Sequence, residues 1–113
     1  MKLRTERLQI TGYGSYFQLS RGREHVGEFH VNSSNLGVML RPSFRGQGYG
    51  LEAGRPILDH LGPYFQTSAF TAAWNIPCQR LLTALGFSFK FHRRCPDAVS
   101  PDWFYYTYNE LTV

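Results

Sequence analysis

The residues best suited to chemistry form a glycine-rich run in the middle of the chain, Arg45-Gly46-Gln47-Gly48-Tyr49-Gly50. Its three alternating glycines let the backbone turn tightly, because no Cβ atom obstructs it. A helix is expected directly afterwards, so the amides of the loop and of the first helical turn can point at one spot near the positive end of the helix dipole. Arg45 adds a charged, forked donor suited to phosphate. The run therefore predicts a diphosphate site.

The spacing of the glycines differs from that of two other phosphate-binding loops. A dinucleotide-binding loop needs G-x-G-x-x-G, whereas the pattern here is G-x-G-x-G. A Walker A loop needs Lys and then Ser or Thr after a glycine, and neither follows here. Short glycine runs also occur as turns that bind nothing, so that alternative stays open at this point.

Short strands on either side of two helices must position this run. Alternating apolar and polar residues predict an antiparallel meander of strands at 8–13, 16–21, 25–31 and 36–41. Downstream we expect a helix at 49–61 containing Pro56, a strand at 64–71 parallel to the strand before the helix, a helix at 76–85 capped by Asn75 and Gly86, and strands at 87–93 and 103–109. This order predicts an α/β (α+β) fold: a mixed, mostly antiparallel sheet of six to seven strands with two main helices.

Length and composition indicate one globular domain, residues 1–113. The chain has 113 residues, which is enough for a single compact core and too few for two. Apolar residues make up 42% and aromatic residues 16%, as in folded proteins. No apolar run approaches the ~20 residues of a membrane span, and the N-terminus becomes polar too early for a signal peptide. We therefore expect a cytoplasmic protein with no membrane partner.

Charge and cysteines point to a small anionic ligand rather than to nucleic acid or metal. The net charge is +4, yet only His92-Arg93-Arg94 forms a basic cluster, and no groove-reading motif accompanies it. An anionic coenzyme explains the charge equally well. Cys78 and Cys95 lack a CxxC spacing, so we expect two free thiols and no metal site.

Three motifs in order resemble the GCN5-related N-acetyltransferase (GNAT) superfamily. The R-x-x-G-x-G pattern of Arg45, Gly48 and Gly50 resembles its pyrophosphate loop. Asn75-x-x-Cys78-x-Arg80-Leu81-Leu82-x-x-Leu85-Gly86-Phe87 resembles its second signature, in the form N-x-x-S…G-F of the branch that acetylates ribosomal-protein N-termini. Thr5-Glu6-Arg7-Leu8 resembles the opening of that branch. Together they cover nearly the whole chain.

The resemblance implies a fold in which the strand before the loop splays from its parallel neighbour and holds the pantetheine arm of acetyl-CoA between them. A backbone amide near Leu40 would polarise the thioester carbonyl, as in an oxyanion hole. Asn75 matches the asparagine that holds the pantetheine arm, a role compatible with capping a helix. The implied coenzyme-binding residues are Val38, Met39, Leu40, Arg45, Gly46, Gln47, Gly48, Tyr49, Gly50 and Asn75.

The implied chemistry needs a base for the amine and an acid for the leaving thiolate. Glu28 is the first candidate base, and His30 shares its strand face and titrates nearer neutrality. The family's tyrosine acid, seven residues after the asparagine, falls on Leu82 and is missing. Cys78 stands where the branch has serine and is the candidate acid, ahead of tyrosines 105 and 106. A solvated strand carboxylate and an inert buried thiol remain the ordinary alternatives.

The sequence departs from the family where acceptors bind. Typical members have two helices between the first and second strands, whereas only residues 12–15 separate them here. One hypothesis is an acetyl-CoA-dependent N-acetyltransferase with an open cleft for a protein N-terminus, lysine or small amine, or with a homodimer mate supplying the missing wall. The other is a non-catalytic module that binds acyl-CoA or a protein partner.

Overall fold

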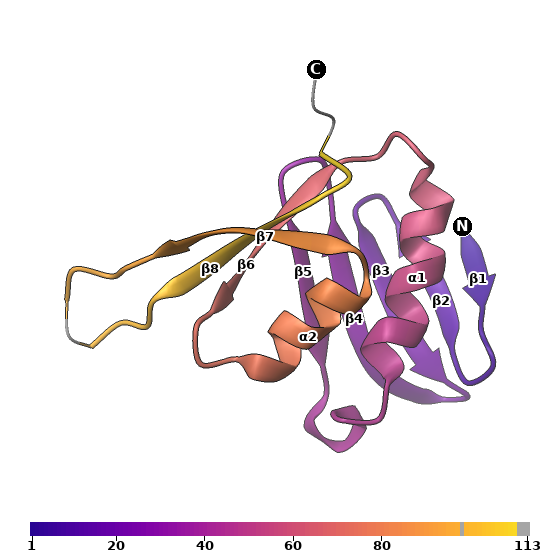
Figure 1. The fold of residues 1–113 in the computed structure, drawn as a ribbon. Helices are drawn as coiled ribbons and strands as arrows, with labels where there is room; N and C mark the ends of the chain where they lie inside the picture. Colours follow the sequence, from indigo (N-terminus) through magenta and orange to yellow (C-terminus); the bar gives the residue numbers. More distant parts are fainter. Residues whose placement is uncertain (98, 111–113) are drawn as a thin grey trace.

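Two antiparallel sheets meet in the middle of the molecule, and both helices pack on one side of them (Figure 1). The computed structural model describes residues 1–97 and 99–110. The first sheet has the order β1-β2-β3-β4-β5 and the second β6-β8-β7. In chain order the elements are β1 (Lys2–Arg4), β2 (Gln9–Tyr13), β3 (Tyr16–Arg21), β4 (Glu24–Val31), β5 (Leu36–Leu40), the 3₁₀ turn η1 (Pro42–Phe44), α1 (Tyr49–Leu61), β6 (Thr67–Ala72), α2 (Ile76–Ala84), β7 (Phe87–Arg93) and β8 (Trp103–Tyr108).

The predicted alternation sorts side chains onto two faces of the first sheet. In β4, Phe29 and Val31 are buried, while Glu28 and His30 on the opposite face are half-buried. Phe29 reaches α1, since a Cβ atom on Gly54 would lie 3.3 Å from its ring. We call the face covered by α1 and α2 the helix face, and the opposite one the outer face.

The two helices contact each other through glycines of α1. A Cβ atom on Gly54 would come within 2.7 Å of Cδ2 of Leu85, and one on Gly50 within 3.0 Å of Cδ2 of Leu81. Such distances force a neighbour to move, so both glycines permit the close approach. Gly50, the last glycine of the motif, therefore lets α1 pack closely against α2, and this packing holds the start of α1 in place.

Strands β5 and β6 run in the same direction and diverge (Figure 1). At their starts, the hydroxyl of Thr67 donates to the carbonyl oxygen of Asn32 at 2.7 Å, and that of Ser68 donates to the carbonyl oxygen of Ser34 at 2.6 Å. Within the described residues no ladder of backbone hydrogen bonds joins the two strands, and each pairs with a neighbour on its other side only. The predicted splayed parallel pair is present.

The α+β class, the two helices and the antiparallel meander are confirmed, with differences in detail. The described residues form eight strands in two sheets, because β1 pairs with β2 and was not predicted. The strand predicted at 64–71 begins only at Thr67, since a turn that bonds Phe65 N to Gly62 O precedes it. Pro56 neither ends nor shortens α1. Between β2 and β3 there is no helix, as predicted, and the connection is a two-residue turn at 14–15, because Gly12 and Tyr13 of the predicted link pair within the sheet.

Candidate active site

The loop of residues 45–50, hereafter the glycine loop, is held at the end of β5 by two of its own side chains. The Nε of Arg45 donates to the carbonyl oxygen of Leu40 at 2.9 Å, and the amide of Gln47 donates to that of Ser43 at 2.8 Å. Gly46 and Gly48 have φ angles of 72° and 83°, in the left-handed region that favours glycine. The loop is therefore a fixed turn whose conformation depends on two of its three glycines.

The N-terminus of α1 carries amides that the chain leaves unpaired. Its N-cap, Gly48, offers no side-chain cap, and the first amide to bond is that of Glu52, which donates to Gly48 O at 3.0 Å. The amides of Tyr49, Gly50 and Leu51 donate to no acceptor within residues 1–97 and 99–110. Unpaired amides at the positive end of a 13-residue helix are suited to bind an anion.

A second guanidinium, which the sequence did not single out, lies beside this site. Arg7 stacks over the ring of Tyr49 at 4.0 Å, and its Nη2 is 3.5 Å from where a Cβ atom on Gly48 would be. Glu52 fixes Arg7 by accepting from its Nε at 2.6 Å and from its backbone amide at 2.9 Å, and it also accepts from the hydroxyl of Thr5. In the sequence, the spacing of Thr5 and Arg7 in the N-terminal segment was the one indication of this contact.

The same contacts set the ionisation of this carboxylate. Partial burial would raise the pKa of Glu52, but the hydrogen bonds from Thr5 and Arg7 outweigh burial and hold its pKa below the usual value. Glu52 is therefore charged at neutral pH and ties the N-terminal segment to the first turn of α1.

At the far end of the splayed strands, Asn75 begins α2. Its side-chain oxygen accepts from the amide of Cys78 at 3.2 Å, so the expected N-cap is present. Val38 and Leu40 pack partly against the core, whereas the side chain of Met39 is 62% exposed on the outer face. The edge of β5 that faces β6 pairs with no strand in the described part of the chain. Residues 38–40 can therefore offer main-chain groups to a ligand between the strands.

Comparison with known proteins gives this geometry a family. The sequence profile of the acetyltransferase (GNAT) domain matches residues 3–88, which includes the glycine loop and the start of α2. The chain belongs to the GNAT acetyltransferase family. It is therefore an N-acetyltransferase by family, and acetyl-CoA is the donor that this family uses. No curated protein matches the sequence significantly.

Solved GNAT structures share the fold at low sequence identity. An acetyltransferase from Bacillus anthracis is 16% identical with a TM-score of 0.76, and the match covers 95% of this chain and 97% of that one. RimL, a ribosomal L7/L12 acetyltransferase solved with coenzyme A, is 13% identical with a TM-score of 0.70 over 83% of this chain and 62% of its own. A ribosomal-protein-S5-alanine acetyltransferase from Vibrio fischeri is 16% identical with a TM-score of 0.68 over 81% of this chain and 59% of its own.

Within the GNAT fold, the candidate catalytic residues lie on opposite faces. Glu28 and His30 are on the outer face of β4, where Glu28 has Gln18 and Met39 as cross-strand neighbours. The ring of His30 lies 4.7 Å from that of Tyr16. Cys78 is half-buried in the first turn of α2, on the helix face. The structure brings Asn75 and Cys78 together, and Glu28 and His30 together, but places the two pairs across the sheet.

At the position where many GNAT enzymes have a tyrosine acid, this chain has a leucine of the hydrophobic core. Leu82 is 1% exposed and packs in the hydrophobic core. Of the three tyrosines on β8, Tyr106 faces α2 and is 5% exposed, while Tyr105 lies on the outer face between Phe70 and Phe91. Burial, and then the nearby Cys78, raise the pKa of Tyr106. Tyr106 is thus the tyrosine beside the candidate acid.

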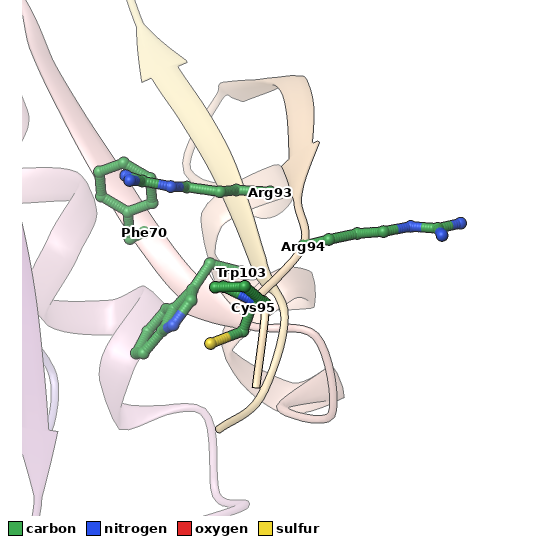
Figure 2. Close-up of a pocket in the computed structure, with 6 residues that line it drawn as sticks. Phe70, Arg93, Arg94, Cys95 and Trp103 are labelled. Carbon is green, nitrogen blue, oxygen red and sulfur yellow. The ribbon is translucent and has the colours of Figure 1, made fainter. Parts of the chain in front are cut away.

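The outer face of the second sheet carries a hollow of about 450 Å³ (Figure 2). Its lining residues are Phe70, Arg93, Arg94, Cys95, Pro96 and Trp103. Figure 2 shows Arg93 extending toward Phe70 and Arg94 pointing away from the hollow. Asp102 fixes the adjoining hairpin, accepting from the amide of Cys95 at 2.9 Å and pairing with His92 at 2.8 Å. The hollow therefore combines two aromatic side chains, Phe70 and Trp103, with two arginines at its edge.

The described residues contain neither a metal-binding cluster nor a helix that could span a membrane. No group of three or more His, Cys, Asp or Glu residues comes together as a metal-binding cluster in residues 1–97 and 99–110. Neither helix in that part of the chain is long and apolar enough to cross a membrane.

Proposed function

We propose that this protein transfers the acetyl group of acetyl-CoA to a primary amine, by direct attack in a ternary complex. The observation that carries the proposal is the uncapped start of α1, where the amides of Tyr49, Gly50 and Leu51 lack acceptors among the described residues and the guanidinium of Arg7 lies alongside. A diphosphate supplies the negative charge and acceptor oxygens that these groups need.

The remaining coenzyme contacts follow from the splayed strands. The pantetheine arm runs from the glycine loop along the open edge of β5, where the main chain of Val38, Met39 and Leu40 pairs with its amides. The side-chain amide of Asn75 holds the arm from the other side, because capping occupies only its oxygen. A backbone amide near Leu40 stabilises the oxyanion that forms on the thioester carbonyl.

The acceptor approaches from the outer face, which neither helix covers. Glu28, directly or through a water, takes a proton from the amine, with His30 as the neighbouring alternative. The amine nitrogen then bonds to the carbonyl carbon, the C–S bond breaks, and its electron pair stays on sulfur. Cys78 delivers a proton to that thiolate from the helix face and regains one from solvent. An outer face this open suits a protein N-terminus or a lysine better than a tightly enclosed small amine.

One observation favours a second candidate, a GNAT-derived module that binds acyl-CoA or a protein partner without catalysis. The position of the usual tyrosine acid is Leu82, a buried core residue whose side chain has no proton to donate. Under this alternative the glycine loop still binds coenzyme.

The test is acetyl transfer measured as thiol release from acetyl-CoA, with peptides bearing free N-termini, lysine peptides and small amines as acceptors. Turnover that depends on acceptor supports the enzyme, and product mass identifies the acylated amine. Thermal stabilisation by coenzyme A without turnover favours the binding module, and the absence of both refutes both candidates.

Variants on one strand separate chemistry from binding. Glu28→Gln should keep coenzyme affinity and lose about 10²–10⁴-fold in kcat if it removes the base. Glu24→Gln is the matched control, because Glu24 lies exposed at the other end of β4. Equal activity of the two variants would exclude Glu28 as the base.

A further inference from the structure

Thr71, on β6, has a buried hydroxyl that the chain does not satisfy. Its residue is 3% exposed, and among the described residues its Oγ1 is the buried side-chain oxygen or nitrogen without a hydrogen-bond partner. Thr67 has the same residue type on the same strand face, yet its hydroxyl donates to Asn32 at 2.7 Å. A buried hydroxyl normally has a partner, so an orphan at a ligand site indicates a partner outside the chain.

The position of Thr71 identifies that site. It lies near the end of β6, beyond the two side-chain bonds that tie the start of this strand to the chain before β5. Four residues later Asn75 caps α2, and Gln79 holds the first turn of α2 to the end of β6 by donating to the carbonyl oxygen of Ala73 at 2.9 Å. In Figure 1 the end of β6 and the start of α2 lie at the same end of the sheets as the glycine loop.

The neighbours of Thr71 include residues to which the proposed function assigns the sulfur end of the coenzyme. Across the ladder from Thr71 is Phe104, and the next pair on the same face is Ala69 with Tyr106, the tyrosine beside Cys78. Thr71 therefore shares the helix face with Asn75 and Cys78, to which the proposed function assigns the pantetheine arm and the leaving sulfur. The diphosphate, by contrast, is assigned to the start of α1.

We propose that the Thr71 hydroxyl donates a hydrogen bond to the sulfur of the coenzyme. This inference rests on the proposed function for the identity of the ligand. The bond is weak to a thioester sulfur and strong to the thiolate that forms as the C–S bond breaks, because charge on the acceptor strengthens a hydrogen bond. No proton is transferred by Thr71, whose role is to stabilise the charge until the acid delivers a proton.

The experiment compares Thr71→Val, which removes the hydroxyl at nearly constant shape, with Thr71→Ser, which keeps it. At a pH at which the bound thiol is ionised, Thr71→Val should bind coenzyme A about tenfold more weakly, and adenosine 3′,5′-bisphosphate, which lacks the arm, as tightly as the wild type does. Its kcat should fall about tenfold with KM nearly unchanged, because the bond matters most in the transition state. Thr71→Ser should retain most of both. Thr71→Val should also raise the pKa of the bound coenzyme thiol, measured by ultraviolet absorbance of the thiolate.

Thr67→Val is the matched control, since it removes a hydroxyl that has a partner in the chain. It should lower the stability of the ligand-free protein and leave the ratio of the two ligand affinities unchanged. Thr71→Val should leave ligand-free stability equal or higher, because no internal bond is lost.

Unchanged affinity for coenzyme A in Thr71→Val, or a loss of ligand-free stability as large as in Thr67→Val, would overturn the inference. The binding comparison does not require turnover. A wild-type protein that binds coenzyme A but transfers no acetyl group would therefore refute the proposed catalysis while the affinity ratio still decides the role of Thr71.

Discussion

Gly48→Glu should abolish coenzyme binding while leaving the protein folded. Gly48 is the N-cap of α1 at φ 83°, ψ 4°. A left-handed conformation costs an L-residue about 1–2 kcal/mol, which lowers Tm by about 5–10 °C in a domain of this size. The larger effect falls on the ligand, because the new carboxylate would stand beside amides that otherwise face a diphosphate. Two unit charges about 5 Å apart repel by about 3 kcal/mol at an effective dielectric constant of about 20, or roughly 10²–10³ in Kd.

Two companion variants separate backbone strain from charge. Gly48→Ala adds the same strain without the charge, and its Cβ would be in ordinary contact, 3.5 Å from Arg7 Nη2. Gly14→Glu adds both the strain and the charge at φ 61° in the turn between β2 and β3, with nothing within 4 Å. Isothermal titration with coenzyme A should give an affinity loss of at most about tenfold for Gly48→Ala and none for Gly14→Glu. If Gly48→Glu is folded and binds coenzyme A within about threefold of the wild type, the diphosphate does not lie at the start of α1.

Three other substitutions test the supports of the site. Glu52→Gln should destabilise the protein by about 1–3 kcal/mol at pH 7, because it weakens the bonds to Arg7 and Thr5. Since the folded-state pKa of Glu52 lies below its unfolded value, the wild-type contribution is complete above the unfolded pKa and disappears as pH falls through the folded one. Urea titrations at pH 7 and pH 3 should thus show that the difference in unfolding free energy between wild type and Glu52→Gln becomes smaller in acid. A difference that is the same at both pH values would contradict the role assigned to the Glu52 carboxylate. Asn75→Asp should keep the cap on α2 while Asn75→Ala loses about 1 kcal/mol of stability, yet both should weaken coenzyme A binding in titration. Cys78→Ala should lower kcat but not coenzyme affinity, and full activity in steady-state assays would show that the thiol is inert.

The sequence predicted the elements with strong local signals. The bounds of α1 follow from the glycine loop at its start and Gly62 at its end, which has φ 98°. Asn75 caps α2 as its residue type indicates. Strand β1 was missed because an alternation over only three residues is too short to indicate a strand, and β1 is defined by its pairing with β2. The contact between Arg7 and Glu52 was also missed, because the two residues are 45 positions apart in the sequence.

The packed structure also shows roles that the sequence did not predict for residues it had singled out. From the sequence, all three alternating glycines were predicted to expose backbone amides, but in the structure they have two different roles. Gly46 and Gly48 have positive φ angles, whereas Gly50 is helical and makes room for Leu81 of α2. The orphaned hydroxyl of Thr71 could not be foreseen at all, because an unmet hydrogen bond is visible only when all neighbours are in place. Residue type and spacing thus locate a ligand loop, and the packed structure is needed to find the ligand's other end.

The division of the molecule into two faces separates the proposed coenzyme contacts from the side on which the acceptor is proposed to bind. The helices α1 and α2, which hold two of the proposed coenzyme contacts, lie on the helix face and pack together through Gly50 and Gly54 of α1. Nothing on that face requires a segment between β2 and β3, where a two-residue turn suffices. Neither α1 nor α2 covers the outer face. Tyr16, Met39, Phe70 and Trp103 are therefore exposed there, on the same face as the half-buried Glu28 and His30. Coenzyme binding should consequently be an intrinsic property of the chain, while efficient transfer depends on an acceptor large enough to cover those side chains itself.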